Sequence, residues 1–159
     1  MEIREIENEV KEQQDDTADI ALEVEQHRRH AEQLEVAVHA LLEAQSTVDS
    51  EGVRKAIDHA TEATYATYQR VQELREQRDS MLERNTDLSN RCATALDRKR
   101  KALEHLPHLH WGHTTVMPAD PKFSIYTSME DTLRESIDRV GRAHADLADI
   151  RRRLEGLEL

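Results

Sequence analysis

Apolar residues recur at alternating steps of three and four positions over two long stretches of the chain, residues 3–41 and 53–102. This spacing puts the apolar side chains on one face of an α-helix, and no proline interrupts either stretch. Such a pattern is typical of helices that pair along a narrow apolar seam. It predicts an all-α fold, an elongated antiparallel coiled coil or helical bundle of three long helices.

The helix boundaries follow from the turn formers and capping residues. We expect the first helix at about residues 2–45 and the second at about residues 50–105, joined by a turn so short that they must be antiparallel neighbours. A third helix, capped by Ser128 and spanning about residues 129–158, is expected to return along the second as far as Arg75.

Three polar residues interrupt the apolar rows of the first helix: Gln13, Thr17 and His27. Polar side chains on a seam weaken it, and they can fix the register and the partner of a helix. They can equally be partly exposed and simply tolerated. The sequence leaves both interpretations open.

The segment at residues 106–128 breaks the helical pattern. It holds every proline of the chain, its only tryptophan and its only phenylalanine. Residues 108–111 and 123–126 alternate polar and apolar side chains on either side of a proline-containing turn. We therefore predict a short β-hairpin-like insertion between the second and third helices, which must lean on the helices or on a partner because an isolated hairpin is marginally stable.

Histidines cluster near this segment. Two of them, His108 and His110, would project to one face of a strand, and closely spaced imidazoles are common Zn²⁺ ligands. No cysteine pair or well-placed carboxylate accompanies them, so we predict no metal and no cofactor and consider a proton-sensitive contact as another role. The candidate metal ligands are His105, His108, His110 and His113.

Aromatic and apolar side chains are the candidate anchors for a protein partner, because buried aromatic residues dominate interface energies. Tyr65 and Tyr68 lie one turn apart on the second helix, where they could form a contact surface or simply cover a narrow seam. The candidate partner-binding residues are Trp111, Phe123, Ile125, Tyr126, Tyr65 and Tyr68.

Composition narrows the class of function. The net charge of −11 repels phosphate backbones, and the basic runs at residues 98–101 and 151–153 lie where cations complement the ends of helices, so we expect no nucleic-acid partner. No stretch has the roughly 20 apolar residues of a membrane span, and the N-terminus does not look like a signal peptide. We expect a cytoplasmic protein with a single helical domain, residues 1–159.

No nucleophile, base and orienting acid can be assembled from the sequence, and no phosphate-binding loop is present, so we do not expect an enzyme. We predict a non-enzymatic interaction or assembly module that joins another protein or itself, as a homo-oligomer, through its helical seams. From residue 53 onward, the predicted helix, β-hairpin and helix resemble the layout of prefoldin chaperone subunits, without a matching motif. This resemblance implies a holdase-like chaperone as an alternative, and the histidine cluster implies a metal-binding module as another.

Overall fold

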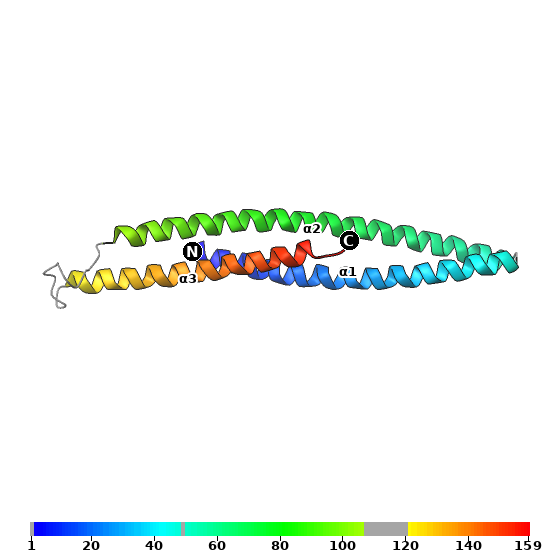
Figure 1. Ribbon diagram of the computed structural model, residues 1–159, viewed down its shortest axis with the longest axis horizontal. Helices are drawn as coiled ribbons and strands as arrows, with labels where there is room; N and C mark the ends of the chain where they lie inside the picture. Colours follow the sequence, from blue (N-terminus) through cyan, green and yellow to red (C-terminus); the bar gives the residue numbers. More distant parts are fainter. Residues whose placement is uncertain (1, 49, 107–120) are drawn as a thin grey trace. The chain divides into compact units, whose positions relative to one another are not determined.

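The structure is a computed structural model that describes residues 2–48, 50–106 and 121–159, without the side chains of residue 2 and residues 121–124. This part of the chain forms three α-helices and no strand (Figure 1). The all-α prediction is confirmed. The helices are α1 at Glu2–Thr47, α2 at Glu51–His105 and α3 at Pro121–Glu155.

The predicted β-hairpin is wrong where it falls on described residues. Residues 123–126, expected to form its second strand, belong to α3, which begins at Pro121 and is not capped by Ser128. Proline is well accommodated in the first turn of a helix, where its missing N–H has no partner to lose. Ile125 and Met129 also continue the helical spacing of α3 backwards, and this spacing prevails over the short alternation. The first half of the predicted hairpin lies outside the described residues.

Local hydrogen bonds end α1 and begin α2. The Ser46 hydroxyl donates to the carbonyl of Glu43 at 2.6 Å. Ser50 then caps α2, because its Oγ accepts a hydrogen bond from the backbone N–H of Val53 at 3.2 Å. α1 ends at Thr47 and α2 begins at Glu51, so the connection between them is short, as the sequence predicted.

The helices contribute to two compact units, which we describe separately. Unit 1 comprises Met1–Gln14 and Arg84–Arg152, and unit 2 comprises Asp15–Glu83 and Arg153–Leu159. The expectation of one helical domain for the whole chain stays a prediction.

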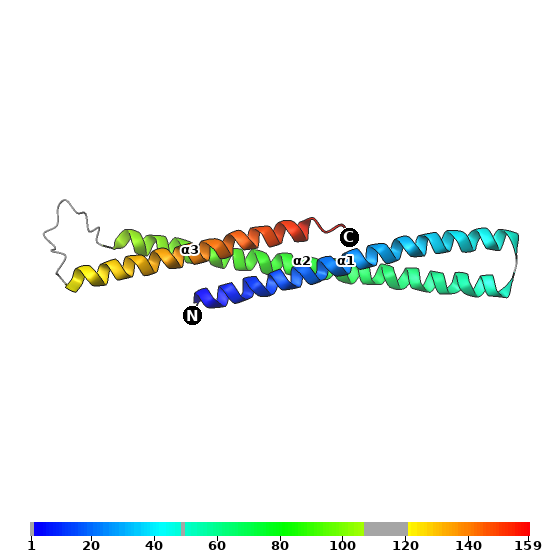
Figure 2. The same cartoon turned by 90° about the horizontal axis from the view of Figure 1, so that it is seen from below.

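Unit 1 packs three helical segments around one core. Glu9 and Glu12 of α1 pair with Arg91 and Arg84 of α2, so these two helices run antiparallel. Figure 2 shows α3 running in the same direction as α1 beside this pair. The buried apolar residues of unit 1 are Ile6, Val10, Leu88, Cys92, Ala95, Leu96, Val140, Ala143, Leu147 and Ile150.

A buried polar layer crosses the core of unit 1. Asn85 is fully buried and Gln13 is 3% exposed. The Asn85 side-chain amide donates to Gln13 Oε1 at 3.3 Å and to the carbonyl of Leu147 at 3.0 Å, so one residue of α2 holds both α1 and α3. Gln13 is therefore buried. In unit 2, Thr17 is also buried, at 2% exposed. The interpretation that these two polar residues are partly exposed and merely tolerated is excluded.

Unit 2 is an antiparallel hairpin of α1 and α2, and residues Arg153–Leu159 pack beside it. Arg75 donates a hydrogen bond through Nη2 to the carbonyl of Leu159 at 2.7 Å, so the residues after α3 reach Arg75, whereas the helix itself ends at Glu155 rather than at about residue 158. The buried residues of unit 2 are Thr17, Ile20, Val24, Ala60, Thr67, Leu74, Met81 and Leu154.

The seam of unit 2 is covered unevenly. Up to Val24, the seam residues of α1 in this unit are buried. Beyond it Leu34, Val38 and Leu41 are only half-buried and Ala31 is exposed. Two helices enclose a seam on fewer sides than three do, so this part of the hairpin keeps apolar surface in contact with water.

We expect Asn85→Ala to lower the free energy of unfolding by about 1–3 kcal/mol, because Gln13 and the Leu147 carbonyl lose a buried hydrogen-bond donor. Urea unfolding followed by circular dichroism measures this. Asn90→Ala, at an exposed position of α2, is the matched control and should change the value by less than about 0.5 kcal/mol. Equal effects of the two substitutions would contradict the role of the polar layer.

Acid should weaken unit 1 through Glu7. The Arg139 guanidinium donates hydrogen bonds to this carboxylate at 2.8 and 2.5 Å and holds its pKa below the ordinary value of 4.5. The folded state therefore binds this proton less readily than the unfolded state, so the contribution is complete above pH 4.5 and is lost as pH falls through the lowered pKa. Unfolding measured over a pH series should show a shallower acid dependence for Glu7→Gln than for the wild type, and superimposable profiles would contradict this.

Candidate functional site

Of the four histidines considered as candidate metal ligands, only His105 lies among the described residues. His105, at the last turn of α2, is exposed, and its Nδ1 lies 2.7 Å from the carbonyl oxygen of Lys101. His108, His110 and His113 lie outside the described residues. Among the residues that are described, no group of three or more His, Cys, Asp or Glu side chains could hold a metal ion.

The candidate partner anchors divide between the two units. Trp111 lies outside the described residues, and the description of Phe123 covers only its backbone in α3. In unit 1, Ile125 is 58% exposed and Tyr126 is half-buried. Tyr65 and Tyr68 belong to unit 2.

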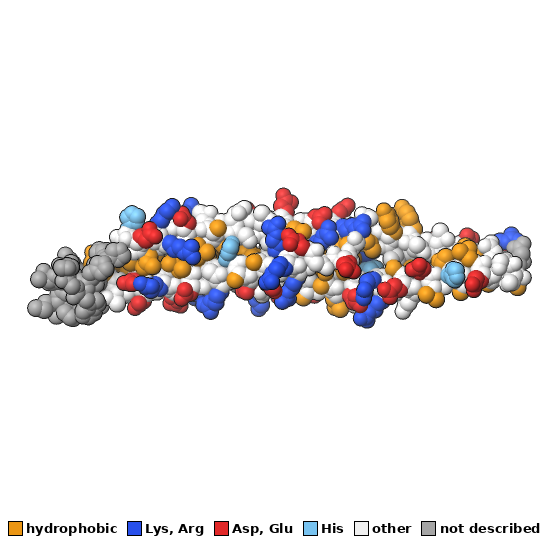
Figure 3. All heavy atoms as spheres, in the orientation of Figure 1, with side chains coloured by type: hydrophobic (Ala, Val, Ile, Leu, Met, Phe, Trp, Pro, Cys, Tyr) orange, Lys and Arg blue, Asp and Glu red, His pale blue; other side chains and the backbone are white. Residues whose placement is uncertain are grey.

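Tyr65 and Tyr68 form an exposed pair on α2. They are 63% and 61% exposed, whereas the seam positions Ala60 and Thr67 beside them are buried at 9% each. The pair therefore faces solvent, and the interpretation that it covers the seam is wrong. Figure 3 shows further hydrophobic side chains on the surface of this hairpin. The exposed large apolar residues of α1 in unit 2 and the turn after it are Leu22, Val36, Leu42 and Val48.

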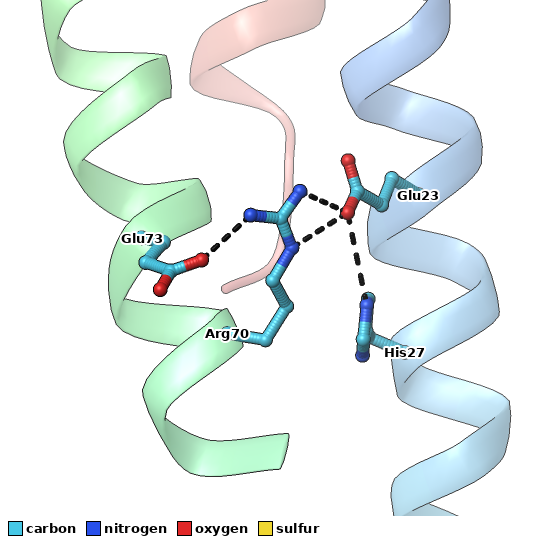
Figure 4. Close-up of polar contacts among 4 residues, drawn as sticks. All are labelled: Glu23, His27, Arg70 and Glu73. Atoms are coloured by element: carbon cyan, nitrogen blue, oxygen red, sulfur yellow. Dashed lines mark hydrogen bonds and ion pairs between the residues drawn. The ribbon is translucent and has the colours of Figure 1, made fainter. Parts of the chain in front are cut away.

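An ion-pair cluster joins α1 to α2 in unit 2 (Figure 4). Arg70 donates through Nε to Glu23 Oε1 at 2.6 Å and through Nη1 to Glu73 Oε2 at 2.6 Å. Its Nη2 also contacts Glu23. His27, one turn after Glu23 on α1, places its Nε2 3.8 Å from the same carboxylate oxygen.

The cluster braces two helices. The Glu73 and Glu23 carboxylates raise the pKa of Arg70, so the guanidinium stays charged and hydrogen-bonded to both carboxylates. His27 Nδ1 is buried and has no hydrogen-bond partner among the described residues. His27 is recognisable in the sequence as an interruption of the seam, but the pairing of Glu23 with Arg70 is not predicted from it. The signal in the sequence was Glu23, an acid next to the seam of α1, together with Arg70, an arginine next to the seam of α2.

Open grooves run along both units. In unit 2 a groove of about 330 Å³ carries carboxylates on an apolar floor. It is lined by Asp16, Asp19, Ile20, Glu23, Gln77, Ser80 and Met81. In unit 1 a groove of about 620 Å³ lies between α2 and α3. Its lining is Leu96, Arg100, Ile137, Asp138, Gly141 and Arg142.

Cys92 is an apolar core residue of unit 1. It is fully buried, and burial raises the pKa of its thiol above the ordinary value of 9.0. The thiolate is therefore disfavoured at neutral pH, which agrees with the packing role predicted from its place on the seam.

No family model matches this chain, and no curated protein or solved structure gives a significant match. None of the described helices combines the length and apolar content that a membrane span needs.

We expect the pairing of Glu23 with Arg70 to stabilise the protein modestly, because both side chains are about one-third exposed. In a double-mutant cycle with Glu23→Gln and Arg70→Gln, the coupling in the free energy of unfolding should be about 0.5–1 kcal/mol. The pair Glu25 and Arg29, one turn apart on α1, is the control and should couple more weakly, because its side chains are more exposed. A coupling near zero for Glu23 and Arg70 would contradict a bracing role.

Proposed function

We propose that this chain is a non-enzymatic interaction module that joins another protein, or a second copy of itself, into an assembly. The observation that carries the proposal is the exposed pair Tyr65 and Tyr68 on the two-helix hairpin of unit 2, at 63% and 61% exposed. Tyrosine suits interfaces because a broad apolar ring ends in a polar hydroxyl, so it tolerates water before binding and buries a large area afterwards.

The surroundings of the tyrosine pair support this role. Leu34, Val38 and Leu41, which face the seam of the same hairpin, are only half-buried. Val36 is 71% exposed and Leu42 is 50% exposed. A partner that packed on the hairpin would remove this apolar surface from water, at roughly 25 cal/mol per Å² of gross stabilisation before the costs of association.

The chemistry of the described ionisable groups supports binding over catalysis. The cluster at Arg70 is tied into ion pairs between helices, and the thiol of Cys92 is buried with a raised pKa. Both arrangements hold helices together and neither presents a reactive atom to solvent. We therefore propose recognition and assembly as the role of the chain.

Replacing both tyrosines tests the proposal. We expect Tyr65→Ser combined with Tyr68→Ser to leave helicity and thermal stability nearly unchanged, because both side chains are exposed. Recovery of a specific partner by affinity capture from the source cells, quantified by mass spectrometry, should fall by about tenfold, in line with the loss of two aromatic contacts. The mass in solution, measured by light scattering, should fall in the same variant if the partner is a second copy.

The matched control is Thr61→Ala combined with Gln69→Ala, two exposed positions on the same stretch of α2. This variant should retain the partner. Equal partner recovery and equal mass for the wild type and the tyrosine variant would contradict the proposal.

A further inference from the structure

The groove of unit 1 lies on the sides of α2 and α3 that are turned away from α1. Acids of α1 pair with Arg91 of α2 and with Arg139 of α3, so these two arginines mark the sides that face α1. At about 100° per residue, Leu96 in the groove lies about 140° round α2 from Arg91. By the same rule, Gly141 in the groove lies about 160° round α3 from Arg139. The groove is therefore separate from the surface on which α1 packs.

The floor of this groove is apolar. Leu96 of α2 is 9% exposed, and Ile137 of α3 is half-buried. In the left part of Figure 3, hydrophobic side chains run between α2 and α3, and Lys and Arg side chains lie along the edges. An apolar channel between two packed helices is a surface on which a further helix can pack, because its side chains fit between those of the two helices.

Gly141 is a glycine that the packing of the described chain does not require. It lies inside α3, and its backbone φ is not positive. A Cβ placed on it would meet no atom of the described residues within 4 Å. Glycine makes a helix less stable than alanine does, because it loses more backbone freedom on folding. Its benefit at the floor of a groove is that another backbone can approach closely. Gly141 therefore points to a group that packs here from outside the described chain.

Two arginines on the rim of the groove are available to a ligand. Arg100 and Arg142 are exposed and form no ion pair within the described part of the chain. By contrast, Arg91 and Arg139, which face α1, are each held by a glutamate. Asp138 also lines the groove, so the lining carries two positive charges against one negative charge. The charge of the groove is complementary to an acidic ligand.

We propose that this groove binds an acidic amphipathic helix of a partner protein. The apolar face of the bound helix covers Leu96 and Ile137, and a small residue of that helix packs on Gly141. Carboxylates on the flanks of the bound helix pair with Arg100 and Arg142.

Shape and charge together select this occupant. A single-stranded nucleic acid would use the two arginines but would bring its phosphates close to Asp138, and the groove offers no aromatic side chain on which a base could stack. An amphipathic helix uses both the apolar floor and the arginines. The inference rests on the proposed function only in treating the chain as an interaction module, because the tyrosine pair belongs to unit 2 and the groove to unit 1.

A synthetic peptide of about 20 residues, long enough to form a helix when bound, serves as the probe. It carries leucine and alanine on one face, glutamate on both flanks and a fluorescein label. Its binding to the full-length protein is followed by fluorescence anisotropy. Arg100→Glu combined with Arg142→Glu should weaken binding by about tenfold or more, because two attractive charges become repulsive. A matched peptide with lysine in place of each glutamate should bind this variant more tightly than it binds the wild type.

Gly141→Leu tests the floor of the groove without a change of charge. The leucine side chain occupies the space of the bound helix, so binding of the glutamate peptide should weaken by about tenfold. The thermal midpoint should not fall, because leucine favours a helix more than glycine does and its Cβ meets no described atom. Weaker binding by a protein at least as stable as the wild type distinguishes a blocked groove from a damaged fold. Gly141→Ala should show a smaller loss of binding in the same direction.

Arg98→Glu combined with Lys101→Glu is the matched control for charge. Both side chains are exposed on α2 and lie on sides of the helix turned away from Leu96. This variant has the same net charge as the variant of the two groove arginines. It should bind each of the two peptides within about twofold of the wild type.

Four outcomes would overturn the proposal. Equal losses of affinity in the two charge-reversal variants would show that net charge alone governs binding. Unchanged affinity for the glutamate peptide in the Gly141→Leu variant would place the peptide outside the groove. A lower mass of that variant than of the wild type, by light scattering without peptide, would assign the groove to a second copy of the chain. Tighter binding of a single-stranded oligonucleotide than of the glutamate peptide, lost when Arg100 and Arg142 are reversed, would assign the groove to nucleic acid.

The variant in which Tyr65 and Tyr68 are replaced by serine should bind the glutamate peptide as the wild type does. The failure of this inference is thereby distinguished from the failure of the proposed function.

Discussion

Each helix of this protein has one apolar stripe, and the stripe is buried only where enough neighbours surround it. In unit 1, three helical segments enclose Leu88 and Leu147 almost completely. In the hairpin of unit 2, two helices leave Leu34 and Leu41 half-buried. The number of neighbouring helices therefore sets how much of each apolar stripe is buried and how much stays in contact with water.

The three helices carry different charges at their contacts. In the ion pairs that Arg70, Arg84, Arg91 and Arg139 make with α1, α1 supplies the carboxylate and α2 or α3 supplies the arginine. Each surface pair adds little free energy. Their common direction matters more, because two helices that both present carboxylates repel each other, whereas the arginines beside the seams of α2 and α3 attract an acidic helix. The asymmetry helps to specify which helix packs where.

The helical part of the fold could be predicted from sequence because a sustained three-and-four spacing has no competing interpretation over such lengths. The first turns of α3 could not, because residues 123–126 fit a strand and a helix about equally well over four positions. Burial of Gln13 and Thr17 was also open, since a seam position does not say how many helices surround it. The tyrosine pair was recognised, but its exposure depended on knowing which side of α2 the partner helix occupies. The pairing of Glu23 with Arg70 needed the relative register of two helices, which apolar spacing alone leaves undetermined.

The contact between Glu7 and Arg139 joins positions 132 residues apart, and this has a consequence for synthesis. At about 5–20 residues per second, the ribosome adds Arg139 on the order of ten seconds after Glu7. During that interval the first turns of α1 have no α3 to pack against and can pack only against α2. The dense carboxylates of this stretch keep the waiting helix hydrated.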